Sequence, residues 1–266
     1  GRAGRQDWWP TTAWRRAHRG RPCYSRLMCG RYSLTTAPEA MRQLFALSGL
    51  PANLAPRYNI APSQEAPVVR PAREGGGREL TLLRWGLVPA WSKGPDSRFS
   101  MINARAETVA EKPSFRAALR HRRCLVPADG FYEWQRRAGA KQPYRIGLAG
   151  GAPFAFAGLW EHWRGAEGDE IQSFTIITTV ANAALAPIHD RMPVILERAD
   201  YGLWLEGGPE ATSAAQALLR ASPDEATTAY PVSSHVNNPR NDDARCIAEL
   251  APSGEAPRWS SAAGRL

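Results

Sequence analysis

The chain has 266 residues, of which 43% are hydrophobic and 9% aromatic, and its formal net charge is +9. This composition suffices for a packed core and excludes a predominantly disordered protein. No apolar run reaches about 18 residues, which excludes a transmembrane helix, and the first residues lack the apolar segment of a secretory signal. We therefore expect a soluble protein of the cell interior, with no membrane partner.

Most of the positive charge lies at the beginning of the chain. Residues 1–28 carry seven arginines and one acid, a net charge of +6, which leaves only +3 for residues 29–266. This segment has no helical or strand periodicity. It could be a basic nucleic-acid arm, a targeting peptide, or upstream sequence included by a wrong start. We favour the last interpretation and expect residues 1–28 to be a non-native or disordered extension.

The ordered pattern begins after this extension. Amphipathic spacing predicts a helix over Ala37–Gly49, ended by its glycine, with Met41, Leu44 and Phe45 toward the core. Short runs rich in β-branched and aromatic residues, bounded by Gly and Pro, predict strands. These runs cover residues 79–89, 123–134, 143–150, 153–163, 173–181 and 192–196. Residues 199–207 and 212–222 are interpreted as helical.

The order of these elements indicates the fold class. No regular alternation of strands and helices is present, so we expect an α+β fold. It would be a single domain over residues 29–250, with a mainly antiparallel, barrel-like β core and a few peripheral helices. Residues 251–266 have the composition of a flexible tail.

Polar residues inside strand-like runs are the first candidates for chemistry, because a buried polar group needs a partner. Asn103, Arg105 and Glu107 alternate, so they share a face if the chain is extended there. Glu133 lies among aromatic residues, and His189 precedes a predicted strand. Each has a structural interpretation: an arginine partner for the glutamate, a satisfied core histidine, a turn-capping asparagine. Together with Cys29 they form a candidate nucleophile, acid/base and amide set.

A second group of residues is typical of binding. Arginine and tryptophan are interleaved with Gly and Pro turns in residues 57–64, 83–93 and 111–119. Arg84 and Arg116 would neutralise phosphate, and an exposed Trp85 or Trp91 would stack on an unpaired base for roughly 1–3 kcal/mol. The alternative for both tryptophans is a place in the core. The four cysteines include no C-x-x-C pair, which argues against a zinc site and a disulfide framework, so we expect no metal and no cofactor.

Seven ordered segments resemble a known family. They are MCGRYSLTT, RYNIAPSQ, RWGLVPAWSK, MINARAETV, KPSFRAALRHRRCLVPADGFYEW, FAGLWE and TTVANAALAPIHDRMPVIL. In this order they are similar to the SOS response-associated peptidase (SRAP) family, the abasic site processing proteins. The resemblance covers about residues 29–250. The extension departs from the family pattern, in which the cysteine is the second encoded residue, and this puts the given start in doubt.

The resemblance implies a sensor of DNA damage that binds single-stranded DNA at abasic sites and joins covalently to the sugar, with autoprocessing peptidase and abasic-site lyase activities. By motif match, the catalytic residues would be Cys29, Asn103, Glu133 and His189. The DNA-binding residues would be Arg31, Arg84, Trp85, Arg105 and Arg116. We expect a cytoplasmic protein, associated with the nucleoid if bacterial, that acts as a monomer and has replication-fork proteins as possible partners.

The chemistry of an abasic site explains why the cysteine must be N-terminal. Its α-amine condenses with the sugar aldehyde to an imine, and its thiol closes a five-membered thiazolidine on the same carbon. Glu133 and His189 would transfer protons, and Asn103 would hold the sugar or the cysteine backbone. Two alternatives stay open: an N-terminal-nucleophile amidase or peptidase, and a non-catalytic module that binds single strands.

Overall fold

A computed structural model of the chain describes residues 29–49, 54–72, 76–95, 101–137, 139–208 and 210–251. The expected extension, residues 1–28, lies outside the described residues. So does the expected tail, apart from its first residue. The domain boundaries at residues 29 and 250 therefore stay a prediction.

The larger sheet closes into a barrel. Its strands run in the order β11 (Arg191–Pro193), β10 (Glu170–Val180), β4 (Arg78–Trp85), β3 (Glu65–Pro71), β6 (Arg123–Ala128), β9 (Phe154–Arg164) and β12 (Ile195–Leu196). Because β9 also pairs with β10, the five strands β10, β4, β3, β6 and β9 form a closed ring. Closure removes the open sheet edges. This confirms the expected barrel-like core.

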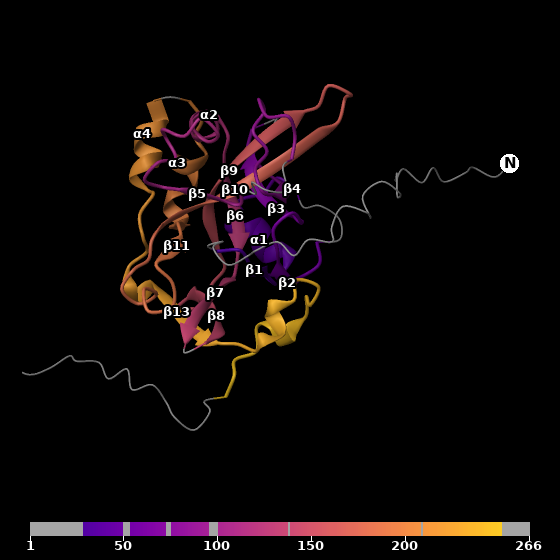
Figure 1. The fold of residues 1–266 in the computed structure, drawn as a ribbon. Coiled ribbons are helices and arrows are strands. Elements are labelled where there is room, and N and C mark those ends of the chain that lie inside the picture. Colours follow the sequence, from indigo (N-terminus) through magenta and orange to yellow (C-terminus); the bar gives the residue numbers. More distant parts are fainter. Residues whose placement is uncertain are drawn as a thin grey trace, which may run out of the picture.

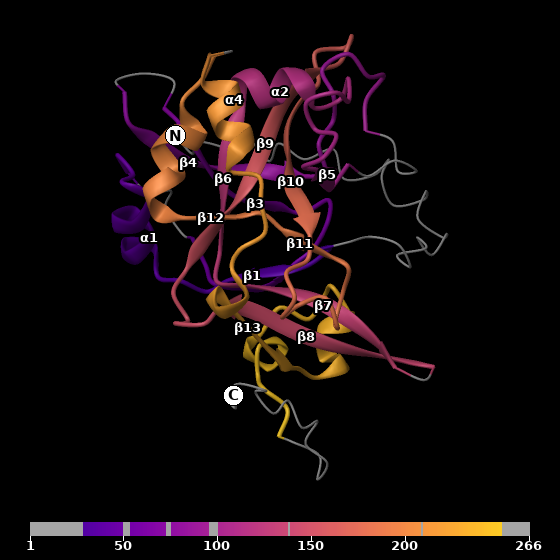
Figure 2. The ribbon, with the colours of Figure 1, turned by 90° about the vertical axis from the view of Figure 1, so that its left-hand side faces the viewer.

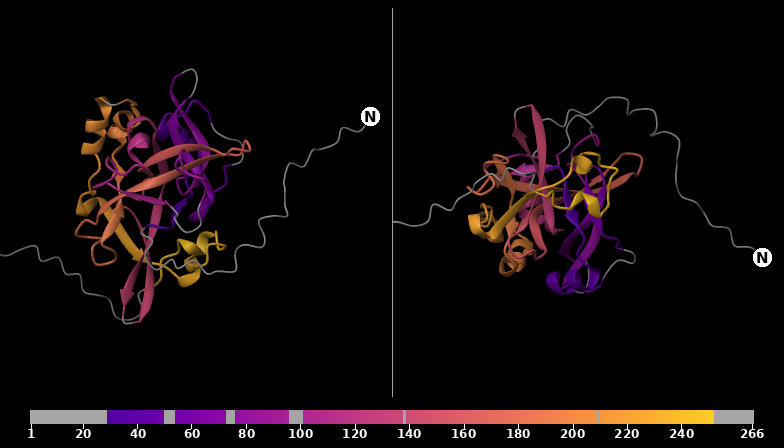
Figure 3. Two further views of the ribbon diagram at one scale, coloured as in Figure 1. Left: turned by 45° about the horizontal axis from the view of Figure 1, so that its top comes forward. Right: turned by 90° about the horizontal axis from the view of Figure 1, so that it is seen from below.

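Most pairs in this sheet are antiparallel, as expected. The exceptions in the described chain are β10 with β4, and β10 with the short strand β5 (Asn103–Arg105), which are parallel. Beyond the barrel, β9 and β10 extend together as a long hairpin (Figures 1 and 3). The α+β class and the single-domain barrel are therefore both confirmed.

A second, five-stranded sheet lies beside the barrel (Figure 2). Its order is β13 (Thr227–Pro231), β8 (Ala140–Leu148), β7 (Gly130–Arg137), β1 (Tyr32–Leu34) and β2 (Arg57–Ile60), and every neighbouring pair is antiparallel. The strand β1 pairs with β7 through Tyr32 opposite Phe131 and Ser33 opposite Gly130. This register determines where the chain just before β1 lies.

Aromatic side chains fill the space between the two sheets. Tyr32 packs edge-on against Trp85 and Phe156, with ring centroids 5.2 and 5.9 Å apart. Trp85 stacks on Phe174, and its indole N–H donates to the carbonyl of Ile102. All four rings are fully buried, so they form one continuous core in which buried area supplies most of the stability.

Helices cover the periphery. The helix α1 (Pro38–Phe45) ends earlier than the predicted range, because Ala46 adopts a left-handed conformation with φ of 51° and returns its N–H to Arg42. The other α-helices, α2 (Arg116–His121), α3 (Tyr201–Leu205) and α4 (Glu210–Ala217), gather at one end of the barrel (Figure 1). Short 3₁₀ helices follow: η2 (Arg198–Asp200), η3 (Asp224–Ala226), η4 (Ser234–Asn237) and η5 (Ala244–Cys246). Among the described residues, no helix is long and apolar enough to span a membrane.

Candidate active site

Cys29 lies directly before β1 and is almost fully buried, with 1% of its surface exposed. Its backbone nitrogen donates a hydrogen bond to Oε1 of Glu133, at 2.6 Å. The two residues are 104 positions apart in the chain. They meet because the antiparallel register of β1 and β7 continues past Tyr32. The backbone N–H of Tyr132 donates to the carbonyl of Arg31 and extends this pairing.

The carboxyl group of Glu133 has an unusual proton affinity. Burial raises its pKa from 4.5 to about 8, the hydrogen bond from Cys29 opposes this shift, and the negative charge of Asp190 adds to it. Desolvation penalises the charged form of a carboxylic acid. At pH 7 most molecules therefore carry a protonated Glu133, which is the state expected of a group that donates protons.

The thiol of Cys29 is held in its unreactive form. Burial, and to a smaller extent the nearby Glu133, raise the pKa of this thiol well above its usual range. The thiolate is the nucleophilic form of cysteine. The chemistry of Cys29 in this environment therefore requires a base that accepts the thiol proton during the reaction.

His189 and Asp190 lie in the loop between β10 and β11. Nδ1 of His189 is 3.0 Å from the backbone nitrogen of Arg191 and 3.3 Å from its carbonyl oxygen. Nδ1 of His189 is 3.1 Å from Oδ1 of Asp190. Gln135 of β7 donates to the carbonyl of Pro187 and ties the loop to the strand that carries Glu133. Asp190, which contacts His189, also raises the pKa of Glu133 through its negative charge.

Asn103 is half-buried at the start of β5, opposite Ile176 of β10. Arg105, two residues later, is exposed, whereas Glu107 lies beyond the strand and forms a two-pronged ion pair with Arg191 at 2.5 and 2.9 Å. The expected alternation of three polar residues on one extended face therefore holds only within β5. The catalytic role of Asn103 stays a prediction.

The predicted DNA-binding arginines have different surroundings. Arg116 at the start of α2 is exposed, like Arg105. Arg84 is half-buried and donates to the carbonyl of Gly86 and to the hydroxyl of Ser63. The guanidinium group of Arg31 donates to Asn59 and to two backbone carbonyls of η4. Arg31 therefore also holds the C-terminal segment in place.

Trp85 requires a correction. Its indole is fully buried against Tyr32 and Phe174, so it presents no face on which a base could stack. The physical reason is the register of β4, which turns Leu83 and Trp85 inward. Trp91, six residues later, has 68% of its surface exposed.

One residue that holds the site together was missed. Asn59 in β2 is fully buried, and its Nδ2 donates to the carbonyls of Val236, Asn238 and Asn241. The signal in the sequence was an asparagine inside the strand-like run RYNI. Its partners lie about 180 residues away, so no local pattern reveals its role.

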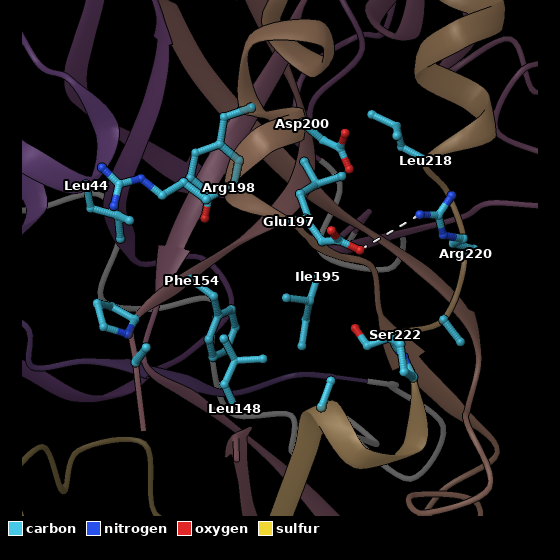
Figure 4. A pocket seen from close by; sticks show the side chains of 17 residues that line it. Leu44, Leu148, Phe154, Ile195, Glu197, Arg198, Asp200, Leu218, Arg220 and Ser222 are labelled. Atoms are coloured by element: carbon cyan, nitrogen blue, oxygen red, sulfur yellow. Dashed lines mark ion pairs between the residues drawn. The ribbon is translucent and has the colours of Figure 1, made fainter. Parts of the chain in front are cut away.

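A cavity of about 450 Å³ opens elsewhere, between β12, η2, α3 and the segment after α4 (Figure 4). Its walls are mainly apolar, with Leu44, Phe154 and Ile195 among them. Glu197 and Arg220 form a 3.9 Å ion pair at its polar side. None of the predicted site residues lines it.

The fold and the site define a class of protein: a mainly antiparallel β-barrel with a buried cysteine whose backbone nitrogen binds a protonated carboxyl group. The family model "SOS response associated peptidase (SRAP)" matches residues 28–239, so the chain belongs to the SRAP family.

Known relatives agree with this assignment. The chain is 42% identical over 223 residues to the Bacillus subtilis protein named abasic site processing protein YoaM, an alignment that covers 83% of this chain and 97% of that protein. It is 33% identical over 265 residues to the Xenopus tropicalis abasic site processing protein HMCES, covering 84% of this chain and 78% of the relative.

Solved structures have the same fold. A Bacteroides thetaiotaomicron protein superposes with a TM-score of 0.73 at 26% identity, covering 84% of this chain and all of the other. A phage-related protein from Bordetella bronchiseptica superposes with a TM-score of 0.61 at 35% identity, covering 77% and 94% of the two chains.

Proposed function

We propose that this protein processes abasic sites in DNA by forming a covalent bond between Cys29 and the sugar. The proposal rests mainly on one observation, the 2.6 Å hydrogen bond from the nitrogen of Cys29 to Glu133. In the 266-residue chain this atom is a peptide nitrogen. If the residues before Cys29 are removed, it becomes an α-amine already in contact with an acid/base group.

The proposed reaction uses both functional groups of an N-terminal cysteine. The amine attacks C1′ of the ring-opened sugar, and water leaves as the imine forms. Sγ then adds to the same carbon while its proton passes to the nitrogen, which closes a thiazolidine. The carboxyl group of Glu133 lies 2.6 Å from this nitrogen, so a proton can pass directly between the two groups.

The other residues have supporting roles in this proposal. His189 would deliver a proton to the sugar oxygen during ring opening. Asn103 would hold the sugar or the cysteine backbone. Because an imine acidifies C2′, β-elimination of the strand is a natural side reaction and would supply the lyase activity without further residues.

The DNA contacts in this proposal are mainly to phosphates. The exposed Arg105 and Arg116, with the half-buried Arg84 and Arg31, would bind the backbone of a single strand, so binding before crosslinking should weaken with salt. An unpaired base would stack on the exposed Trp91 rather than on the buried Trp85. We further infer a monomer in the cytoplasm that meets its substrate at replication forks.

Exposure of the amine requires loss of all residues before Cys29. We infer that residues 1–28 are absent from the working protein, which would comprise a domain over residues 29–250 and a tail. Glu133 would assist cleavage of the bond before Cys29 by donating a proton to the leaving group. This is the proposed autoprocessing peptidase activity.

The test is a crosslinking assay with a single-stranded oligonucleotide that contains one abasic site. A protein that starts at Met28 should give a shifted band that survives heat and SDS. The band should be lost in Cys29→Ala and kept in Cys124→Ala, which alters another buried cysteine. Intact mass should show a thiazolidine adduct on a protein that begins at Cys29.

Two outcomes would contradict the proposal. One is the absence of an adduct, and the other is an adduct of equal yield in Cys29→Ala. Release of a peptide or amide product without any DNA adduct would support the amidase alternative instead.

A further inference from the structure

Three potential metal ligands meet in the C-terminal segment, outside the candidate active site. They come from His235 in η4, from Asp243, the N-cap of η5, and from Cys246 in η5. Each residue offers one ligand atom, and these three atoms lie within 4.8 Å of one another. The distance from Nε2 of His235 to Oδ2 of Asp243 is 3.1 Å. The yellow turns that carry these residues lie next to β7 and β8 (Figure 2).

We propose that His235, Asp243 and Cys246 form a zinc-binding site. Imidazole, carboxylate and thiolate are the ligand types that zinc takes from proteins, and three of them leave one tetrahedral position for water. Ligands at 2.0–2.3 Å from a tetrahedral centre are roughly 3.3–3.6 Å apart. The imidazole and the carboxylate already have nearly this spacing, so mainly the sulfur must approach.

The charges of the site balance. Neutral imidazole with two anionic ligands, thiolate and carboxylate, compensates the two positive charges of the ion. Cysteine binds zinc as the thiolate, so zinc binding releases the thiol proton and the affinity should increase with pH. The spacing of the cysteines did not indicate this site, because the site uses only one cysteine, whereas a C-x-x-C pair supplies two.

Two neighbouring side chains must adjust. Arg245 contacts both oxygens of Asp243, and it would keep Oδ1 while the ion takes Oδ2. Nδ2 of Asn241 faces Nδ1 of His235 at 3.0 Å, whereas a zinc-bound Nε2 requires the proton on Nδ1. Rotation of the Asn241 amide would present its oxygen to that proton, at the loss of the hydrogen bond from Nδ2 to the carbonyl of His235.

The proposed zinc site lies next to the segment that binds Arg31. The η4 carbonyls of Val236 and Asn237 accept hydrogen bonds from Arg31, two residues after Cys29. An ion that joins η4 to η5 would therefore stabilise the segment that holds the beginning of the folded chain. The inference does not depend on the proposed reaction at Cys29.

The test uses the full chain with Cys29→Ala, because an N-terminal cysteine would itself bind zinc through its amine and thiol. Isothermal titration with ZnCl₂ should give one site per chain. Co²⁺ should produce a thiolate charge-transfer band and tetrahedral d–d bands. His235→Ala should weaken binding about 10-fold or more, whereas the control His121→Ala, on an exposed histidine of α2, should not change it.

Cys246→Ser should abolish the charge-transfer band. Because Cys246 is fully buried, this variant is first checked for folding by circular dichroism, and if it fails to fold, His235→Ala decides. Absence of stoichiometric zinc binding would overturn the proposal. Equal affinity in His235→Ala, or a Co²⁺ spectrum without a thiolate band, would do the same.

Discussion

The protonated state of Glu133 makes the stability of this protein depend on pH in a predictable way. Its pKa is about 8 in the folded chain and 4.5 ordinarily. Between these values the folded state binds more protons than the unfolded state, so the free energy of unfolding decreases as pH rises. Each pH unit costs about 1.4 kcal/mol, and the full interval from 4.5 to 8 therefore costs about 5 kcal/mol. Below pH 4.5 and above pH 8 this contribution is constant.

The substitution Glu133→Gln removes the titrating group and keeps an oxygen that accepts the hydrogen bond from Cys29. Relative to a parent with glutamate, the variant should gain stability steadily from pH 5 to pH 8, by about 4 kcal/mol. Both proteins carry Cys29→Ala, which preserves the backbone N–H, and intact mass checks that neither chain is cut before position 29. Urea unfolding at fixed temperature measures the difference at each pH.

The difference between the two proteins is informative because other titrating groups cancel. Asp243, for example, has its pKa lowered mainly by Arg245 and by His235, and it contributes stability in both proteins that is lost only in acid. A difference curve that stays flat from pH 5 to pH 9 would refute the elevated pKa. The proton-transfer role proposed for Glu133 would then have no basis.

Three further predictions follow from the structure. Arg105→Ala and Arg116→Ala should each lower the affinity for single-stranded DNA and reduce the salt dependence of binding by about 0.7 in log–log slope; an unchanged slope would exclude a phosphate contact. Asn59→Ala removes a buried amide that donates to three carbonyls and accepts from Arg31, and it should cost about 1–3 kcal/mol in urea unfolding. Gly158→Ala would place a Cβ 2.8 Å from a methyl group of Val126 and should cost about 1–3 kcal/mol. The control Gly150→Ala meets nothing within 4 Å and should change stability by less than about 0.5 kcal/mol.

Much of the barrel was predictable because the residues of each strand carry the strand pattern in their own short segment of the sequence. The runs that became β4, β6, β9 and β10 are dense in β-branched and aromatic residues, and their boundaries are glycines and prolines. β3 was missed because Pro67 and Pro71 argue against a strand. In the structure β3 pairs along its whole length with β4, whereas its ladder with β6 pairs Val69 with Leu125. Pro67 and Pro71 therefore lie where the ladder to β6 has no paired residues.

The candidate site was only partly predictable. Glu133 stands out in the sequence as an acid among aromatic residues, but its contact with Cys29 depends on a strand pairing across 104 residues. Trp85 was ambiguous because the choice between core and surface depends on strand register, and a one-residue change in register exchanges the two faces. Long-range pairing therefore decided both cases, because it brings Glu133 to Cys29 and buries Trp85 in the core.

Burial gives Cys29 a protected resting state. While a peptide bond precedes it, its nitrogen is not a nucleophile, and its thiol, with 1% of the residue exposed and a raised pKa, reacts slowly with oxidants because they attack the thiolate. In the proposed reaction, a cut before Cys29 would turn this nitrogen into an amine in contact with Glu133. A positive charge on that amine would lower the pKa of Glu133 and share one proton between the two groups. Glu133 would thus contact a peptide nitrogen in the inert precursor and an amine nitrogen in the reactive product. The two states would differ only in whether a residue is bonded to the nitrogen of Cys29.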